Sequence, residues 1–197
     1  MIRAALRVVR RGCLDSLTAK ALADELGIST QPVFTCFSTM ETLRGEVRAA
    51  AASVFDGYIA DGLKEPIPFL GVGMQYIRFA RTEPQLYRLL FLNDADGKAF
   101  AAMQRAQDAV TPTLMRVYRL DRSGAQRYFR DEWLVVHSLA TLIVTGSCPY
   151  SDDEISAILS GFSTAICGAI KEVPGFTDNS FDRDAFFRAL TEESSAR

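Results

Sequence analysis

Short polar side chains gather between residues 29 and 35 of the sequence. Ser29, Thr30, Gln31 and Thr35 offer hydroxyl and amide groups, which donate and accept hydrogen bonds. Groups of this kind bind base edges in a DNA groove, and they need no metal or cofactor to do so. The chemistry that this stretch indicates is therefore recognition by hydrogen bonding, provided that the surrounding residues hold the polar side chains outward.

Residues 18–43 have the spacing of a helix-turn-helix, which would hold those side chains outward. Thr18 is a good N-cap for the first helix. Gly27 is able to adopt the left-handed conformation of a tight turn, and we expect Ile28 to turn inward and plug the corner. The expected inner face of the two helices comprises Leu22, Ala23, Leu26, Val33, Cys36 and Phe37.

In a helix-turn-helix, the start and the outer side of the second helix enter the major groove of DNA. Ser29 or Thr30 is expected to cap this helix, with Pro32 in its first turn. The Thr18 hydroxyl is placed to meet a phosphate as well. The residues that this spacing predicts to contact double-stranded DNA are Thr18, Ser29, Thr30, Gln31, Val33 and Thr35. Val33 is thus assigned both to the inner face of the second helix and to the DNA-binding set.

The composition is that of an ordinary globular protein, with 48% hydrophobic and 23% charged residues. The net charge is −2, but residues 1–48 carry an excess of Lys and Arg, so that a mildly basic head precedes an acidic body. We expect neither a signal peptide nor a membrane span. The four cysteines form no CxxC pair, which favours a cytoplasmic location over a disulfide framework or a metal site.

Hydrophobic residues recur at helical spacing along the whole chain, and no strand pattern appears. This predicts an all-α fold, with an N-terminal three-helix helix-turn-helix head on a larger helical ligand-binding and dimerisation body. We place the DNA-binding domain at residues 1–48 and the body at residues 49–197. Capping boxes at 38–41, 123–126 and 151–154 predict three helix starts. The first of these helices is expected to bury Leu43, Val47, Ala50, Val54, Tyr58 and Ile59.

The N-terminal helix, which should end at Gly12, is amphipathic. Its polar side carries Arg3, Arg7 and Arg10. A row of arginines beside a DNA-reading motif is either a solvated surface or a set of phosphate contacts, and the sequence leaves both open.

Several residues of the head match the pattern of a known family. An apolar helix ending at Gly12 is followed by Leu17-Thr18, Ala23, Leu26-Gly27-Ile28-Ser29, Val33-Phe34, Phe37 and Ser38-x-x-Glu41-x-Leu43. This pattern resembles the N-terminal domain of the TetR family of bacterial transcriptional regulators. Residues 76–80, 83–87 and 90–91 also look like the start of a regulatory domain in one branch. The resemblance implies a homodimer that binds a near-palindromic operator as a repressor and releases it when a small apolar or aromatic molecule enters the body.

Three positions depart from the family pattern. Family members usually have tyrosine at the position of Phe34 and lysine at that of Met40, both contacting the DNA backbone, and often histidine or tyrosine at Cys36. The resemblance therefore adds Phe34 and Met40 to the DNA-binding set. Losing a phenol and an ammonium group removes two phosphate anchors per subunit, so operator binding should be weaker and less salt-sensitive than is typical. The nearby cations that would compensate are Arg3, Lys20 and Arg44.

Two long apolar helices near the C-terminus are too hydrophobic to face one modest core alone. We expect them to pack with the same helices of a second subunit as a four-helix bundle, a monomer core being the alternative. A rigid pair also suits two operator half-sites about 34 Å apart. The predicted dimer interface comprises Ala140, Ile143, Val144, Ile155, Ile158, Phe162, Ala165 and Ile166.

Aromatic and sulfur-containing side chains are frequent in the middle of the chain. At helical spacing each one is more often packed in a core, but the resemblance implies that a subset lines a cavity. His137, the only histidine, is either a satisfied core group or a ligand contact. The residues expected to contact an unknown small-molecule effector are Tyr58, Phe79, Tyr87, Phe91, Met103, Met115, Trp133 and His137.

Other functional classes have less support in the sequence. One histidine, no HExxH motif and no nucleophile elbow leave little for catalysis, so we expect no enzyme. An all-α protein-interaction module, or a small-molecule-binding protein without operator binding, stays as the alternative. A redox sensor at Cys36 is disfavoured because its spacing puts the thiol on the inner face, where a buried neutral thiol is inert.

Overall fold

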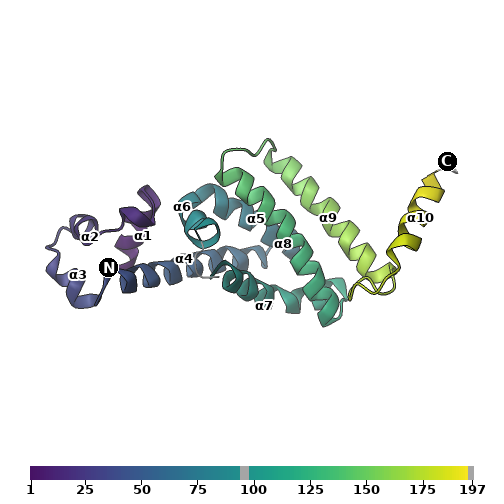
Figure 1. Ribbon diagram of the computed structural model, residues 1–197, viewed down its shortest axis with the longest axis horizontal. Coiled ribbons are helices and arrows are strands. Elements are labelled where there is room, and N and C mark those ends of the chain that lie inside the picture. The colour runs from purple at the N-terminus through teal and green to yellow at the C-terminus, as the bar shows by residue number, and fades with distance from the viewer. Residues whose placement is uncertain (94–97, 195–197) are drawn as a thin grey trace.

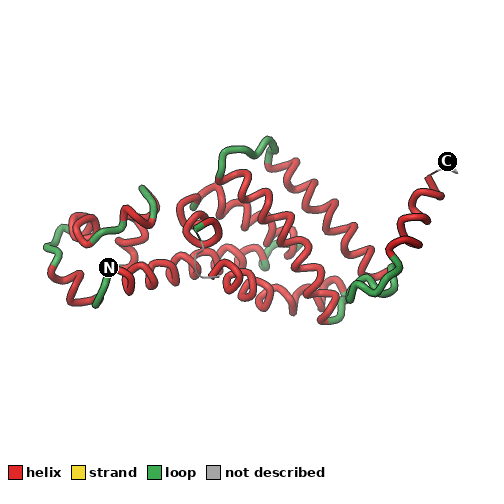
Figure 2. The backbone as a smooth tube through the Cα atoms, in the orientation of Figure 1, coloured by secondary structure: helices red, strands yellow, loops and turns green. Residues whose placement is uncertain are grey.

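The computed structural model describes residues 1–93 and 98–194, which form an elongated helical molecule with a small head at one end (Figure 1). The helices are joined by short loops, and no strand occurs among these residues (Figure 2). The prediction of an all-α fold is confirmed. The head contains α1 (Ile2–Arg11), the 3₁₀ turn η1 (Leu14–Ser16), α2 (Ala19–Leu26) and α3 (Gln31–Cys36).

The long helix α4 (Met40–Gly62) runs from the head into the body. The body comprises α5 (Pro68–Thr82), α6 (Pro84–Tyr87), the π-helical turn η2 (Arg88–Leu92), α7 (Lys98–Tyr118), α8 (Arg122–Val144) and α9 (Asp152–Glu172). The last helix, α10 (Arg183–Ser194), projects away from the body beyond the end of α9 (Figure 1). The division proposed at residues 48 and 49 falls inside α4, which is continuous there.

Local capping explains where the long helices begin. The predicted box at Ser151 is present, since Ser151 caps Glu154 N–H while the Glu154 carboxylate accepts from Ser151 N–H. The other two boxes are wrong in register. Thr39, not Ser38, caps α4 by accepting from Thr42 N–H at 3.1 Å, and the cap of α8 is Asp121. A single carboxylate or hydroxyl at the N-cap is enough to begin a helix, so the starts predicted from the capping-box motif were wrong for both helices.

The buried stripe of α4 differs in part from the expected one. Leu43, Val47 and Ile59 are buried as predicted, but Ala50, Val54 and Tyr58 are only half-buried. The helix instead buries Ala51 and Phe55, one position later. The reason lies in the packing partners of α4. This helix contacts both α1 and α5, and its buried residues are those that face these two helices.

An aromatic cluster forms the centre of the body. Phe55 is fully buried, and its ring makes edge contacts with Tyr76, Phe79 and Phe91 at centroid distances of 5.1, 5.2 and 5.2 Å. The Trp133 ring lies 4.9 Å from Tyr76 in the same arrangement. Edge-to-face contacts of this kind add to the free energy gained by burying the rings, so this cluster stabilises the crossing of α4, α5 and α8.

Two glycines allow α4 and α5 to cross in direct backbone contact. A Cβ atom on Gly62 would lie 2.5 Å from the Cα of Val72, and one on Gly71 would lie 2.5 Å from the carbonyl oxygen of Gly62. These distances are too short for any side chain, and the neighbouring atoms are backbone atoms that cannot move aside. The crossing therefore depends on glycine at both positions.

Helix α9 is apolar yet poorly covered. Its length and mean hydropathy of 1.2 would suffice for a membrane span, and only 11% of its most apolar stretch is buried. It is the one such helix in the described part of the chain. Length and composition alone are weak evidence for a span, because a helix that packs on another subunit has the same properties.

Candidate DNA interface, ligand cavities and dimer face

The turn of the head is built as the sequence predicts, except at its corner. Thr18 caps α2 by accepting a hydrogen bond of 3.0 Å from Ala21 N–H, and Gly27 is left-handed with φ 66° and ψ 32°. Ile28 donates its N–H to the Ala23 carbonyl at 3.0 Å. Its side chain, however, is 41% exposed, so the prediction that Ile28 turns inward is wrong.

Helix α3 presents its polar residues to solvent. Ser29, Thr30, Gln31 and Thr35 are exposed, and Thr18 is exposed beside them at the start of α2. Ser29, Gln31 and Thr35 line one shallow depression, which shows that they share a face. The Thr35 hydroxyl donates to the Gln31 carbonyl at 3.1 Å, so its oxygen stays available as an acceptor.

Of the residues expected on the inner face of α3, Val33 is buried and Cys36 is not. Val33, assigned to both faces, is 1% exposed and packs in the core, so a contact of its side chain with DNA is excluded in this conformation. Cys36, expected on the inner face, is exposed. The helix ends at Cys36 and the chain turns to an extended conformation at Phe37, which packs against the core four residues after Val33. Because Cys36 is exposed, the argument that a buried thiol would be inert does not apply to it.

The two positions that depart from the family pattern differ in exposure. Phe34 is 55% exposed, whereas Met40, at the first turn of α4, packs partly against the core. Arg44 lies one turn further along α4, and no described residue accepts a hydrogen bond from its buried Nε atom. Phe34 and Arg44 thus lie on the two segments that would meet a phosphate backbone.

Most arginines of α1 are bound within the protein. Arg7 Nε donates to Glu25 at 2.6 Å, and Arg11 also pairs with Glu25. These hydrogen bonds lower the pKa of the Glu25 carboxyl. Arg10 forms a two-point ion pair with Glu83, with both N–O distances at 2.7 Å, and this pair joins the head to the start of α6 in the body. Three of the arginines thus hold helices together, which favours a structural role over phosphate contacts.

The aromatic residues predicted to line a ligand cavity instead pack against one another. Phe79 and Tyr87 are fully buried, while Phe91 and Trp133 are 8% and 9% exposed. Only Trp133 borders a void, which measures about 20 Å³. At the edge of the cluster, the Tyr58 ring lies 5.3 Å from that of Phe79, and its hydroxyl is hydrogen-bonded to Thr82 at 2.9 Å. The two methionines of the set lie on α7, where Met103 is partly buried against the core and Met115 is 38% exposed.

His137 is a hydrogen-bonded core residue. Its Nδ1 lies 2.9 Å from the Tyr76 hydroxyl and 3.2 Å from that of Tyr87, and Tyr87 also bonds Thr141 at 2.9 Å. Burial lowers the pKa of His137 and raises those of the two tyrosines. A neutral imidazole that accepts a phenolic hydrogen bond fits this arrangement, in line with the alternative of a satisfied core group.

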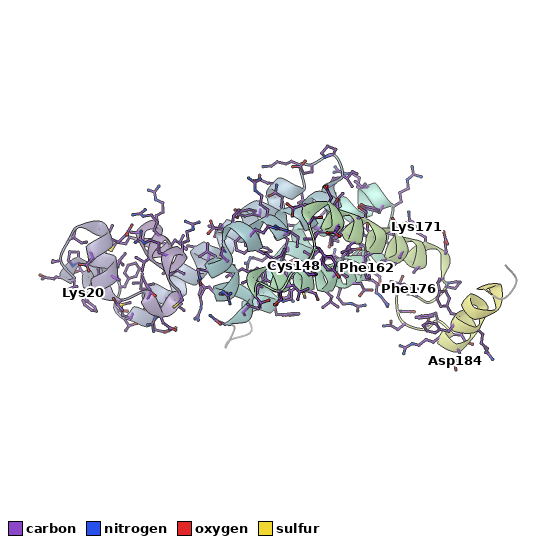
Figure 3. The ribbon with its side chains drawn as sticks, turned by 90° about the horizontal axis from the view of Figure 1, so that it is seen from above. Lys20, Cys148, Phe162, Lys171, Phe176 and Asp184 are labelled. Carbon is purple, nitrogen blue, oxygen red and sulfur yellow. The ribbon has the colours of Figure 1, made fainter. Side chains whose placement is uncertain are left out.

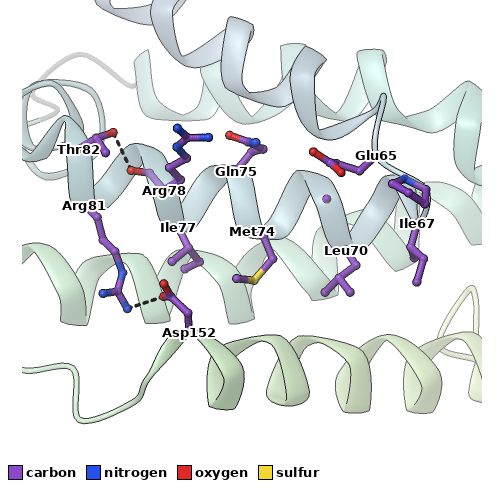
Figure 4. Close-up of a pocket in the computed structure, with 12 residues that line it drawn as sticks. Glu65, Ile67, Leu70, Met74, Gln75, Ile77, Arg78, Arg81, Thr82 and Asp152 are labelled. Carbon is purple, nitrogen blue, oxygen red and sulfur yellow. Dashed lines mark hydrogen bonds and ion pairs between the residues drawn. The ribbon is translucent and has the colours of Figure 1, made fainter.

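Two cavities of ligand size lie elsewhere, along α5. The first has about 600 Å³, and in Figure 4 Leu70, Met74 and Ile77 extend into it from α5 towards α9. Arg81 and Asp152 close one end with an ion pair of 2.8 Å. The second has about 490 Å³ and lies between α5, α8 and α9, with residues from the end of α7. It is lined by Ile67, Phe69, Leu70, Gly73, Tyr118, Glu132, Val136, Leu159, Ser160, Ser163, Thr164, Cys167, Gly168 and Lys171.

The sequence analysis missed Glu132, which is 1% exposed on the inner face of α8. Burial, together with the neighbouring carboxylate of Asp131, raises the pKa of Glu132 to about 7. A signal was present in the sequence, because this acid stands between Tyr128, Phe129, Trp133 and Val136 on an apolar helical face. A charged residue at the spacing of core residues marks a buried polar site.

Only part of the predicted dimer interface is exposed on the subunit, and a second subunit could cover only those residues. Ala140 and Ile155 are fully buried in the subunit and Val144 is 7% exposed, so these three belong to the monomer core. Ile143, Ile158 and Ile166 are partly buried. Phe162, labelled in Figure 3, is 49% exposed, and Ala165 is exposed as well. The apolar residues that α8 leaves uncovered are Leu134 and Leu142, at 60% and 36% exposure.

These observations define a helical protein with a helix-turn-helix head, a body with ligand-sized cavities and an uncovered apolar face. The model of the tetracyclin repressor-like C-terminal domain family matches residues 69–193. The chain therefore belongs to the TetR family of transcriptional regulators. Members of this family bind operator DNA and small molecules and act as dimers. The protein is thus a DNA-binding transcriptional regulator.

Among solved structures, the chain is similar to the TetR family repressor AlkX from Dietzia sp. strain DQ12-45-1b, which is implicated in the biodegradation of n-alkanes. The two share 20% sequence identity over 87% of this chain and 96% of that one, with a TM-score of 0.43. No curated protein matches the sequence.

Proposed function

We propose that this protein is a repressor that binds a near-palindromic operator as a homodimer and releases it when a small molecule enters the body. The observation that carries the proposal is the face of α3, where Ser29, Gln31 and Thr35 are exposed together at one shallow surface. Side chains of these types hydrogen-bond to base edges in the major groove. Thr18, Thr30, Phe34 and Met40 complete the proposed contacts, and Val33 is left out because it is buried.

The proposed dimer forms through the exposed apolar face of α8 and α9. Leu134 and Leu142 lie on α8, and Phe162 and Ala165 lie on α9. Covering this face would explain how a helix as apolar as α9 stays so poorly buried within one subunit. A two-fold pair of this kind would place two α3 helices on successive turns of DNA.

The proposal also assigns the remaining roles of the chain. Residues 1–48 bind DNA, and residues 49–197 bind the effector and the second subunit. TetR-family regulators are generally not enzymes and work in the cytoplasm, and we propose the same for this chain.

Footprinting with the DNA that flanks the protein's own gene tests the proposal. We expect protection of two half-sites about 10 base pairs apart, or a multiple of that spacing. Replacing both Gln31 and Thr35 by alanine should weaken operator binding by at least tenfold, since each lost base contact costs about 1–3 kcal/mol. Gln104→Ala, an exposed glutamine on α7, is the matched control. A protein-interaction module would protect no duplex even at low ionic strength.

Met40→Lys should tighten operator binding. The methionine stands at the first turn of α4 next to the reading helix, where an ammonium group would reach a phosphate. Each added phosphate contact should steepen the dependence of log affinity on log salt by about one per subunit. A gel-shift titration between 50 and 200 mM salt measures both effects, in the range where phosphate contacts dominate. Met115→Lys on α7 serves as the control, and an unchanged slope for Met40→Lys would contradict the account.

A further inference from the structure

Glu132 has the properties of a ligand-recognition residue in the second cavity. Its carboxyl group lines the 490 Å³ cavity and is almost fully buried, yet no described residue donates a hydrogen bond to its Oε1 atom. A buried acceptor without a partner costs about 1–3 kcal/mol, and more when charged. Such a group is usually retained only where it has something to bind.

The rest of the cavity is mostly apolar and is suited to an organic molecule. Phe69, Leu70, Val136 and Leu159 supply hydrocarbon surface from three helices. The Ser163 hydroxyl is already hydrogen-bonded to Tyr128, which leaves Glu132 as the deepest polar group. A few polar groups in an apolar pocket orient a ligand and set its specificity.

We propose that this cavity binds a small molecule with an apolar body and a protonated amine, which donates hydrogen bonds to the carboxylate of Glu132. Calling the cavity an effector site rests on the proposed regulatory function, but the amine preference rests on Glu132 alone. The ammonium group supplies both the missing donor and the charge that offsets a buried carboxylate. The larger cavity along α5 is lined by two acids, but neither is comparable, because Glu65 is exposed and Asp152 pairs with Arg81.

Binding should depend on the ionisation of Glu132. Its pKa of about 7, set by burial and by Asp131, makes the group half neutral near pH 7. An amine ligand with a pKa near that of lysine stays protonated throughout this range. If only the ionised carboxylate binds, affinity should rise about tenfold from pH 6 to pH 8.

Other titratable groups around Glu132 do not obscure this effect. Asp131 is held in ion pairs with Arg127 and Arg130, both at 2.8 Å. On α8, burial lowers the pKa of His137. The remaining titratable groups near the cavity are Lys171 on α9, Cys167 on α9, Tyr118 on α7, Tyr128 on α8 and Tyr76 on α5.

Three probes of equal length test the proposal on the full chain without DNA. They are 4-phenylbutylamine, 4-phenyl-1-butanol and 4-phenylbutanoate, and calorimetry measures their affinities. Trp133 borders the same carboxylate and is the only tryptophan of the sequence, so its fluorescence reports occupancy independently. We expect the amine to bind at least tenfold more tightly than the other two at pH 8. Glu132→Gln should abolish that preference, whereas Glu65→Gln at the mouth of the other cavity should keep it.

A stability measurement separates this role from a structural one. Because the folded-state pKa of Glu132 lies above the unfolded value of 4.5, wild-type stability should fall as pH rises from about 4.5 to 7. Glu132→Gln removes the buried charge, so we expect a higher melting temperature than wild type at pH 8 and little difference at pH 5. A variant that is more stable but binds the amine less tightly identifies a recognition group.

Several outcomes would overturn the inference. These are equal affinities for the three probes, an amine preference that survives in Glu132→Gln, or no binding by any probe at millimolar concentration. Tighter binding of 4-phenylbutanoate would assign recognition to Lys171 and would contradict it too. Operator binding is measured separately by footprinting, so a failure of the proposed function stays distinguishable from a failure of the amine site.

Discussion

Replacing Leu134 and Phe162 by glutamate should convert the protein to a folded monomer that binds its operator at least a hundredfold more weakly. Both side chains are largely exposed in the isolated subunit, at 60% and 49%, so a charge at either position costs little within the monomer. In the proposed dimer the same charges would be buried without a partner, which costs several kcal/mol. Losing the second reading head removes an avidity gain of about 10²–10⁴.

Sedimentation velocity and gel shifts at one fixed salt concentration measure the two effects. Phe100→Glu is the matched control, since Phe100 is 59% exposed on α7, away from the α8 and α9 face. Its variant should stay dimeric with full operator affinity. If the double variant were still a dimer with unchanged DNA binding, the apolar face of α8 and α9 would not be the dimer interface.

Glu83→Gln should reduce the effect that a ligand bound in the body has on operator binding by the head. The ion pair between Arg10 and Glu83 is the two-point link between α1 and α6, and Glu83 is only 14% exposed. Bidentate pairs of this type fix geometry as well as contributing energy. Allosteric coupling between two sites typically changes affinity by about 5–150-fold. We expect 4-phenylbutylamine to weaken operator binding within this range in the wild type. In the variant, the coupling free energy between probe and operator should be less than half the wild-type value.

The ratio of operator affinities with and without the probe is the quantity to measure, because it cancels any general loss of stability. Glu25→Gln is the control, since the described partners of the Glu25 carboxylate, Arg7 and Arg11, both lie inside the head. It should change both affinities by the same factor. A Glu83→Gln protein that responds to the probe as strongly as the wild type would show that this ion pair is not needed for the coupling, which would then pass through α4 or the packing of α1 on α6.

The features that depend on local sequence were the ones most reliably predicted. Helical periodicity gave the all-α fold, and the Thr18 cap and left-handed Gly27 are present as expected. Features that depend on which helices meet were less predictable. Cys36 and Val33 differ by less than one turn, and only the early end of α3 decides which one faces the core.

The same limit explains the errors in the body. Aromatic residues at helical spacing fill a core as readily as they line a cavity, and here Tyr87 and Phe91 pack against Phe55 and Tyr76. Ala140 and Ile155 looked like interface residues because α8 and α9 are apolar on more than one side. Sequence periodicity identifies an apolar face but does not say whether the same subunit or a second one covers it.

The glycine crossing of α4 and α5 has a mechanical consequence. Since no side chain separates the two backbones at Gly62 and Gly71, this point acts as a fixed pivot, while the far end of α4 lies about 33 Å away at 1.5 Å per residue. A tilt of only about 5° at the pivot would then swing Met40 by about 3 Å. In a symmetric pair, small adjustments among the body helices would thus be magnified into a changed separation of the reading heads.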